Sequence, residues 1–327
     1  MRSDTKRLTL CYNATMQTGG IYRFIFGRPD LWYLLNTAVK RVWQRRLFLL
    51  SLWFCLQVGS LFAQSRAEVQ QVKSDTSWRL VWADEFDTNG PPNPKNWVFE
   101  TGFVRNNEYQ WYQAENAHCE NGVLIIEGKR EQRSNPFYKA NSASWRTNRP
   151  TIEYTSSSMK TEKLHQWQYG RFEMRGRIET RSGLWPAFWT LGVSGEWPSN
   201  GEIDIMEYYR NQLLANVAWA TAKRYTAEWR SVKKPMTTFD DPDWSKKFHI
   251  WRMDWDETAI RLYVDDQLLN TVLLAETINQ DGSGLNPFHH PHYVLLNLAI
   301  GGDNGGDPSK TPFPSRFEVD YVRVYQK

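Results

Sequence analysis

The sequence of 327 residues predicts an all-β fold, either a sandwich or a barrel built from many short strands. Strand-like segments recur with turn residues between them from Trp78 to the end of the chain. No window shows sustained helical periodicity. With 41% hydrophobic and 23% charged residues, the chain has enough apolar material for a core. A single all-β unit of more than 200 residues is ordinary at this length.

The expected strands follow one another with short connections. A hairpin is predicted around Asp256–Thr258, and Asp265–Asp266 forms the next turn. The apolar run 293–300 suits an inner strand, whereas the amphipathic segments suit a sheet with one solvated face. Residues 134–150 form a long polar loop, of the kind that borders a binding face. The predicted strands are 79–86, 123–131, 168–180, 187–193, 202–209, 213–221, 248–255, 259–264, 267–272, 293–300 and 316–327.

The N-terminal part has the layout of a secretory signal peptide. A basic segment, Lys40–Arg46, precedes the apolar run Leu47–Ala63, and cleavage after Ala63 is expected. A single transmembrane anchor is the alternative, but the run is short for one. We assign no function to residues 1–39. The predicted organisation is an N-terminal extension with signal peptide (1–63), a polar linker (64–77) and a folded domain (78–327), in a secreted or periplasmic protein.

Charge and cysteine content exclude several classes of protein. Residues 1–46 hold nine Lys and Arg against two Asp, so removing these seven charges from the total of +4 leaves −3 for the rest. The folded domain therefore shows no nucleic-acid footprint. Of Cys11, Cys55 and Cys119, only Cys119 follows the predicted cleavage site, which excludes a disulfide framework and a zinc cluster. The 17 Trp suit either a core or a groove that stacks on sugar rings.

Three acids, Glu202, Asp204 and Glu207, lie in the apolar strand-like segment "NGEIDIMEYY". On a regular strand the first two share one face, and Glu207 points to the opposite, apolar face. Burying a lone carboxylate there is unfavourable. A β-bulge within Ile205–Met206 resolves the conflict, because one extra residue returns Glu207 to the side of the other two acids.

Such a row has the chemistry of a glycosidase. Two Glu carboxyls that lean together to about 5–5.5 Å serve retaining enzymes as nucleophile and acid/base. Like charges this close retain a proton near pH 7, and we expect Glu207 at the end of the row to hold it. A solvated acidic face and a Ca²⁺ site are the alternatives. The Ca²⁺ site lacks further oxygen ligands nearby.

The chain from Trp78 to Lys327 resembles glycoside hydrolase family 16, in particular its laminarinase-like branch. The resemblance rests on "GEIDIMEY", "SGLWPAFWTLG", "YGRFEMRGRIE", "RNNEYQWY", "LNLAIGG" and "VDYVRVYQ", in family order. It implies a concanavalin A-like β-jelly-roll sandwich with a concave substrate cleft, and a catalytic domain over 78–327. Glu202 corresponds to the nucleophile, Glu207 to the acid/base and Asp204 to an assisting acid.

The resemblance also implies substrate-binding residues. Trp197 matches the tryptophan that stacks on the sugar next to the cleaved bond. Trp185 and Trp189 lie in step on one strand, and we expect one of them in the cleft and one in the core.

Polar positions extend the predicted binding site. Asn107 and Arg171 match positions that often reach substrate, although a structural salt bridge is an equal option for Arg171. Many β-glucanases carry a His on the strand after the acid/base. This chain has Ala218 and Trp219 there, and we expect Trp219 to contact substrate.

The resemblance implies that catalysis needs no cofactor. Some family members bind a structural Ca²⁺ away from the cleft, and Glu85 and Asp320 lie in the matching strands. No ligand set for a metal is identified. The expected partner is a polysaccharide or glycan, with no nucleic acid and no membrane after signal cleavage, and the protein is expected to be a monomer.

The predicted function is a retaining endo-β-glycosidase, with β-1,3- or mixed-linkage β-glucan as the first substrate. An endo-β-galactosidase acting on host O-glycans or a galactan is the second option within the same chemistry. "GGDNGGDP" stands where laminarinases often have GGxWPG, so the substrate stays open. A non-catalytic sugar-binding protein and a transglycosylase are the other options, because lectins share this fold.

Overall fold

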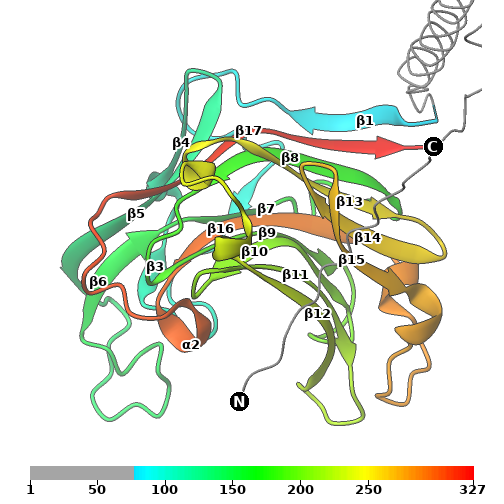
Figure 1. Ribbon diagram of the computed structural model, residues 1–327. Helices are drawn as coiled ribbons and strands as arrows, with labels where there is room; N and C mark the ends of the chain where they lie inside the picture. The colour runs from blue at the N-terminus through cyan, green and yellow to red at the C-terminus, as the bar shows by residue number, and fades with distance from the viewer. Residues whose placement is uncertain (1–76) are drawn as a thin grey trace, which may run out of the picture. The chain divides into compact units, whose positions relative to one another are not determined.

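The computed structural model describes residues 77–327, in which two curved sheets pack face to face (Figure 1). The predicted all-β sandwich is confirmed. The signal peptide predicted for 1–63 and nearly all of the linker predicted for 64–77 lie outside the described residues. Among the described residues, no helix is long and apolar enough to cross a membrane.

The first sheet has ten strands, and its main order is β15-β14-β13-β8-β17-β5-β6-β3. Strand β1 pairs with β17, β4 pairs with β5, and β3 and β6 are parallel. The strands are β1 (Arg79–Asp84), β3 (Gln110–Tyr112), β4 (Ala117–Glu120), β5 (Val123–Ser134), β6 (Thr151–Ser156), β8 (Gly170–Ile178), β13 (His249–Trp255), β14 (Ala259–Val264), β15 (Gln267–Leu273) and β17 (Ser315–Gln326).

The second sheet has seven strands in the order β12-β11-β10-β9-β16-β7-β2. These are β2 (Val98–Phe99), β7 (Ser158–Lys160), β9 (Leu184–Gly192), β10 (Glu202–Tyr209), β11 (Gln212–Ala220), β12 (Ala227–Pro235) and β16 (His292–Ile300). The described helices are all short: α2 (Gly302–Gly305), η1 (Ala114–Asn116), η2 (Met236–Thr238), η3 (Trp244–Lys246), η4 (Leu274–Glu276) and η5 (Pro287–His289).

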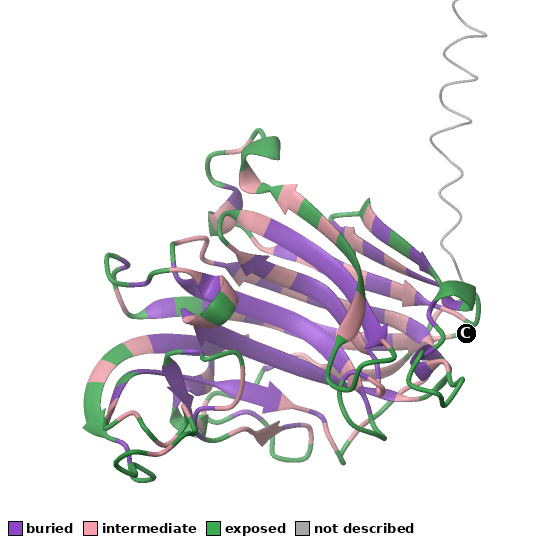
Figure 2. Cartoon of the chain, turned by 90° about the horizontal axis from the view of Figure 1, so that it is seen from below, coloured by how far each residue is buried: buried purple, intermediate pink, exposed green. Residues whose placement is uncertain are grey.

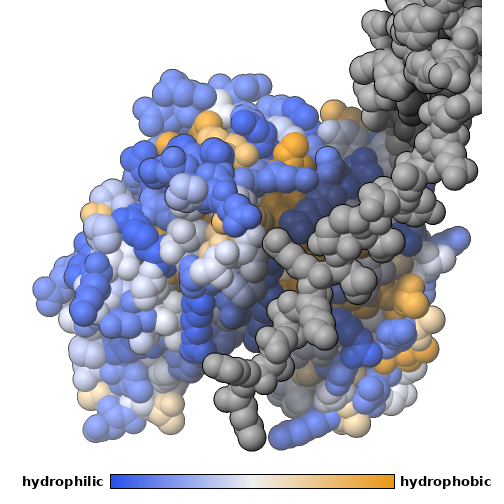
Figure 3. Space-filling model, in the orientation of Figure 1, coloured by the Kyte–Doolittle hydropathy of each residue, from blue (hydrophilic) through white to orange (hydrophobic). Residues whose placement is uncertain are grey.

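The core fills the space between the sheets. Strands β8 and β13 alternate buried and partly buried residues, as expected for strands with one solvated face. Every residue of β16 is buried, in agreement with the inner strand predicted from its apolar run. Figure 2 shows this burial along the central strands, and Figure 3 shows that hydrophilic side chains cover most of the face seen in Figure 1.

Local turn chemistry sets the predicted hairpins. The Asp256 carboxylate accepts hydrogen bonds from the Thr258 and Ala259 amides, at 2.8 and 2.9 Å, and so closes the turn between β13 and β14. Asp265 and Asp266 both have positive φ, as a two-residue hairpin turn between β14 and β15 requires. The sequence did not predict β12, because neither of its faces is consistently apolar.

Candidate active site

Strand β10 contains the predicted bulge. Asp204 pairs with Trp189 of β9, but the next β9 partner, Phe188, faces Met206, so Ile205 is the extra residue. On the β11 side the pairing also shifts between Asp204 and Glu207. Ile205 and Met206 lie in the core, and all three acids line one cavity of about 870 Å³. The bulge therefore places the three carboxyls on the outer face of the seven-stranded sheet, as predicted.

Each acid belongs to a row of residues that crosses the sheet. The antiparallel register fixes these rows, because residues that pair across adjacent strands lie side by side. The rows, read from β9 through β10 and β11 to β12, are Leu191–Glu202–Ala218–Trp229, Trp189–Asp204–Asn216–Ser231 and Ala187–Glu207–Leu214–Lys233. Nearly all of these side chains line the cavity.

Side-chain donors hold the three carboxyls in place. The indole Nε1 of Trp197 donates to Glu202 Oε2 at 2.5 Å, and that of Trp185 donates to Glu207 Oε1 at 2.6 Å. Asn216 Nδ2 donates to Asp204 Oδ2 and to Glu207 Oε2, both at 3.0 Å. Each carboxyl is therefore oriented by at least one neutral donor.

The pKa values of all three carboxyls are raised, and burial is the largest cause for each. Burial, and then the neighbouring charge of Asp204, raises the pKa of both Glu202 and Glu207 well above the ordinary value. Burial raises the pKa of Asp204 to about 6, against the opposing hydrogen bonds from Asn216 and Glu202. The upward shift of the pKa is therefore shared by Glu202 and Glu207, and does not single out Glu207 as expected from the sequence.

Trp185, Trp189 and Trp197 all line the cavity. Trp197 is 38% exposed, whereas Trp185 and Trp189 are buried. Both of the latter face the cavity, because residues four apart on the regular strand β9 share a face. The expected split, one in the cleft and one in the core, is therefore replaced by two tryptophans that line the cavity, of which Trp189 also packs in a small hydrophobic cluster. Trp189 Nε1 donates to Asn297 Oδ1 at 2.7 Å, and Asn297 belongs to the cavity wall as well.

Trp219 does not reach the cavity. It is 2% exposed and packs in the core. Strand β11 is regular here, and Asn216 faces the cavity, so a residue three positions later points to the opposite face. The prediction that Trp219 contacts substrate is therefore wrong.

Arg171 lies on the other sheet, on β8. Its guanidinium binds the Asp254 carboxylate of β13 through Nε at 2.7 Å and Nη2 at 2.9 Å, and it also stacks on Trp78. Since Phe172 beside it points into the core, Arg171 faces the outer surface of the ten-stranded sheet. The structural salt bridge, and not substrate contact, is its role.

Asn107 also lies outside the cavity lining. Its backbone has a positive φ of 50°, and its side chain binds Asp303 of α2 at 3.0 Å. Its neighbours Arg105, Asn106 and Glu108 line the cavity in its place. The motif was correctly identified, but the left-handed turn directs Asn107 away from the cavity.

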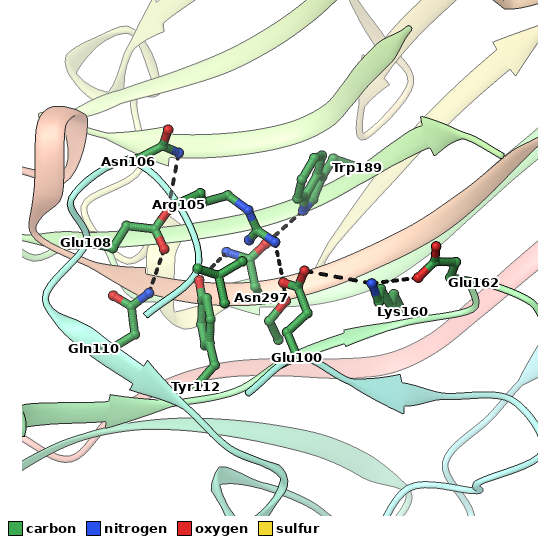
Figure 4. A network of polar contacts seen from close by, with 12 residues as sticks. Glu100, Arg105, Asn106, Glu108, Gln110, Tyr112, Lys160, Glu162, Trp189 and Asn297 are labelled. Carbon is green, nitrogen blue, oxygen red and sulfur yellow. Dashed lines mark hydrogen bonds and ion pairs between the residues drawn. The ribbon is translucent and has the colours of Figure 1, made fainter. Parts of the chain in front are cut away.

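A buried polar network supports this wall of the cavity (Figure 4). Arg105 forms an ion pair with Glu100 and lies 5.2 Å from the Trp189 ring. Burial acts to raise the pKa of Glu100, but Arg105 and other partners hold it below the ordinary value. Glu108 accepts hydrogen bonds from Asn106 at 3.2 Å and Gln110 at 2.6 Å. These contacts fix the wall that faces β12 across the row of acids.

The polar loop after β5 braces the same wall. Arg149 donates to the carbonyl oxygens of Glu108, at 2.6 Å, and Asn107, at 2.9 Å. Arg146 donates to the carbonyl of Val104 at 3.2 Å through Nε. The loop 135–150 therefore borders the candidate site, as predicted.

The residues suggested for a structural Ca²⁺ do not fit one. Arg323 binds both carboxylate oxygens of Glu85 at 2.8 Å, and Arg175 binds Asp320 at 2.6 Å. Among residues 77–327, no group of three or more His, Cys, Asp or Glu is placed to hold a metal ion. We derive no role for a metal.

Comparison with known proteins identifies one family and several of its members as similar to this chain. Residues 106–323 match the family described as glycosyl hydrolases family 16. A β-glucanase of Rhodothermus marinus is 33% identical over 309 residues, which cover 88% of this chain and 96% of that protein. A keratan-sulfate endo-1,4-β-galactosidase of Sphingobacterium multivorum is 26% identical over 256 residues, 77% of this chain and 56% of that protein.

Solved structures share the fold. One from a study of endo-acting O-glycanases, with which human gut microbiota initiate mucin breakdown, is 34% identical with a TM-score of 0.70. The similarity covers 77% of this chain and 92% of the chain in that structure. The laminarinase catalytic domain of Thermotoga maritima is also 34% identical, with a TM-score of 0.64 over 77% of this chain and 99% of its own.

Proposed function

This chain belongs to glycosyl hydrolases family 16, and on that premise we propose that Glu202, Asp204 and Glu207 are the catalytic residues of the endo-β-glycosidase. The protein is a glycoside hydrolase whose substrate is a polysaccharide or glycan. The observation that supports the residue assignment is the bulge at Ile205, which brings the acids to one cavity wall.

The reaction proceeds in two steps with retention at the anomeric carbon. Glu202 attacks that carbon while Glu207 donates its proton to the glycosidic oxygen, and the carbon–oxygen bond breaks. Glu207, now a carboxylate, then takes a proton from water, whose oxygen displaces Glu202. Asp204, hydrogen-bonded with Glu202, keeps that side chain oriented in both steps.

We assign β-linked galactosyl glycans, such as mucin-type O-glycans, as the preferred substrate class. The similarity to a structure from a study of endo-acting O-glycanases, 34% identical with a TM-score of 0.70, supports this choice. The sequence of β11 gives a second support. Ala218 pairs directly with Glu202, at the strand where many β-glucanases place a His.

A β-1,3- or mixed-linkage β-glucan is the second candidate. The 33% identity to a β-glucanase extends over 96% of that protein, which is the observation in its favour. The cavity wall around Trp197 and Trp189 suits either sugar, because aromatic faces stack on sugar rings of both types.

A substrate panel separates these candidates. Residues 64–327 are incubated with laminarin, lichenan, agarose, keratan sulfate and mucin, with Glu202→Gln as the blank, and the products are sized by chromatography. Products from mucin or keratan sulfate alone support the galactosyl assignment, and products from laminarin or lichenan alone replace it by the glucan. Binding without cleavage by a folded protein indicates the lectin, and elongated products with added acceptor sugars indicate transglycosylation.

We also propose that the mature protein is secreted or periplasmic and monomeric. The basic segment and apolar run before Gln64 support export. Mass spectrometry of the mature protein tests it: a first residue at Gln64 in the periplasmic or culture fraction is expected, and an uncleaved chain in the membrane fraction contradicts it. Light scattering tests the monomer.

A further inference from the structure

Strand β12 forms one wall of the cavity, and its influence on the three acids is the charge of Lys233, which acts to lower the pKa of Glu207. Trp229, Ser231 and Lys233 are alternate residues of β12, so they project from one face, and all three line the cavity. Two strand spacings separate β12 from the acids of β10, about 10 Å. Side chains at this distance contact a neighbouring sugar unit of a bound glycan, and not the unit at the cleaved bond.

Lys233 is the feature that needs an explanation. Arg105 and Lys233 are the two cations of the cavity lining. Arg105 is committed to Glu100, whereas the Lys233 side chain has no hydrogen bond or ion pair with any residue in the described part of the chain. It is exposed, and it lies in the same row as Glu207.

The neighbouring Lys234 serves as a comparison, because it lies on the same strand but outside the cavity lining. Lys234 points to the opposite face of β12, donates to Gln267 Oε1 at 3.1 Å and lies 4.9 Å from the Phe239 ring. Charges on an edge strand discourage pairing between molecules, which accounts for Lys234. It does not account for a second cation in the same wall of the cavity as Trp229 and Ser231.

The charge of the cavity decides which ligand this cation suits. Glu108 and the three acids of β10 make the lining predominantly acidic, so a glycan with a negative substituent is repelled unless a cation lies near that substituent. Trp229, 40% exposed, offers an aromatic face for the sugar ring, and Ser231 a hydroxyl. We propose that Trp229, Ser231 and Lys233 form a subsite for a sugar with an anionic substituent, a sulfate ester or a carboxylate.

This inference rests on the proposed endo-glycosidase function, and the test uses pairs of substrates that differ only in charge. The pairs are keratan sulfate with its desulfated form, sialylated mucin with its desialylated form, and laminarin sulfate with laminarin. The ratio of kcat/KM for the acidic member to that for the neutral member is measured for the wild type, for Lys233→Met and for the matched control Lys234→Met.

We expect Lys233→Met to lower this ratio about twofold to fivefold, the upper part of the range for one exposed charge pair. The lower ratio arises from a higher KM for the acidic member of each pair. The effect becomes smaller with added salt, and it is absent in Lys234→Met. A response to the sulfated pairs alone identifies sulfate, and a response to the sialylated pair alone identifies the carboxylate. An unchanged ratio in Lys233→Met on every pair that the wild type cleaves overturns the proposal.

Two further outcomes separate this inference from the proposed function. If Lys233→Met changes kcat for both members equally and shifts the pH profile, Lys233 acts only on Glu207 and the subsite is rejected. If the wild type cleaves no substrate, the catalytic proposal has failed by itself. The ratio of Kd values for the same pairs, measured by calorimetry on the wild type and Lys233→Met, then decides the subsite.

Discussion

Trp185 and Glu207, on the adjacent strands β9 and β10, are joined by a hydrogen bond of 2.6 Å from the indole nitrogen to the carboxyl. The donor favours the ionised form of Glu207, and so opposes the effects of burial and of Asp204 on its pKa. A residue predicted only to bind sugar is therefore also in a position to adjust the acid/base.

Replacing Trp185 by Phe should move the activity profile to higher pH. Without the donor, the pKa of Glu207 rises further, so Glu207 keeps its proton to a higher pH and the alkaline limb of kcat/KM shifts up by about one unit. Trp189→Phe is the matched control, because Trp189 donates to Asn297 and not to an acid. An equal shift in both variants contradicts the special role of Trp185.

Azide should distinguish the two catalytic glutamates. Glu202→Gln and Glu207→Gln each lose activity by about a thousandfold or more. With an activated aryl glycoside, azide attacks the covalent intermediate of Glu207→Gln and gives a β-glycosyl azide. In Glu202→Gln, azide attacks directly and gives the α-azide. NMR of the products checks the anomeric configuration, and the opposite pattern exchanges the two roles.

Neutralising Glu207 should stabilise the protein at neutral pH. The folded state raises the pKa of Glu207, so it binds more protons than the unfolded chain, and wild-type stability falls as pH rises above about 4. Glu207→Gln removes this loss, and its Tm at pH 8 should exceed that of the wild type by about 2–4 °C per kcal/mol gained. At pH 4 the difference disappears. Calorimetry at both pH values measures it.

The exposed Glu257 provides the control for that experiment. Glu257→Gln changes the formal charge by the same amount without touching the cavity, so its Tm should follow the wild type at both pH values. A gain in Glu257→Gln as large as that in Glu207→Gln would trace the effect to net charge and not to the buried row.

Two tryptophans on neighbouring strands should respond in opposite ways. Trp219 lies in the core, so Trp219→Ala lowers stability by about 3–5 kcal/mol while KM stays near the wild-type value. Trp229 is 40% exposed in the cavity wall, so Trp229→Ala leaves Tm nearly unchanged and raises KM by roughly fivefold or more. Thermal unfolding and steady-state kinetics on both variants check this, and a raised KM in Trp219→Ala would restore its predicted role.

The acid row was predictable from sequence because two physical demands conflict in it. An apolar strand with an acid on each face needs either a buried lone carboxylate or an irregular register, and the second is far less unfavourable. The structure has that irregularity at Ile205. The inner strand β16 was predictable from its apolar residues, since a mainly apolar run suits a central strand, although its Asn297 faces the cavity.

Other residues could not be placed because strand parity depends on partners distant in sequence. Trp219 lies on a correctly predicted strand, but only the pairing of Asn216 with Asp204 fixes which of its faces meets the cavity. The sequence of β12 shows no alternation of apolar and polar residues, so no strand was predicted there. Its cavity face carries Trp229, Ser231 and Lys233, and its other face carries mainly charged residues. For Arg171 the sequence left substrate contact and a structural salt bridge as equal options, because a motif does not reveal that its strand belongs to the opposite sheet.

In the rows that cross the seven-stranded sheet, the residues proposed to cleave the bond lie on a different strand from the outermost residues of the cavity wall. The three acids lie on one strand, β10, whereas the neighbouring strands add single side chains to the cavity wall. A point mutation on β12 therefore changes one residue of the wall and leaves the acids and their donor Asn216 on β11 in place. The relatives named for glucan and for keratan sulfate are 33% and 26% identical to this chain. Their names differ in the sugar polymer, and the arrangement permits this divergence in substrate.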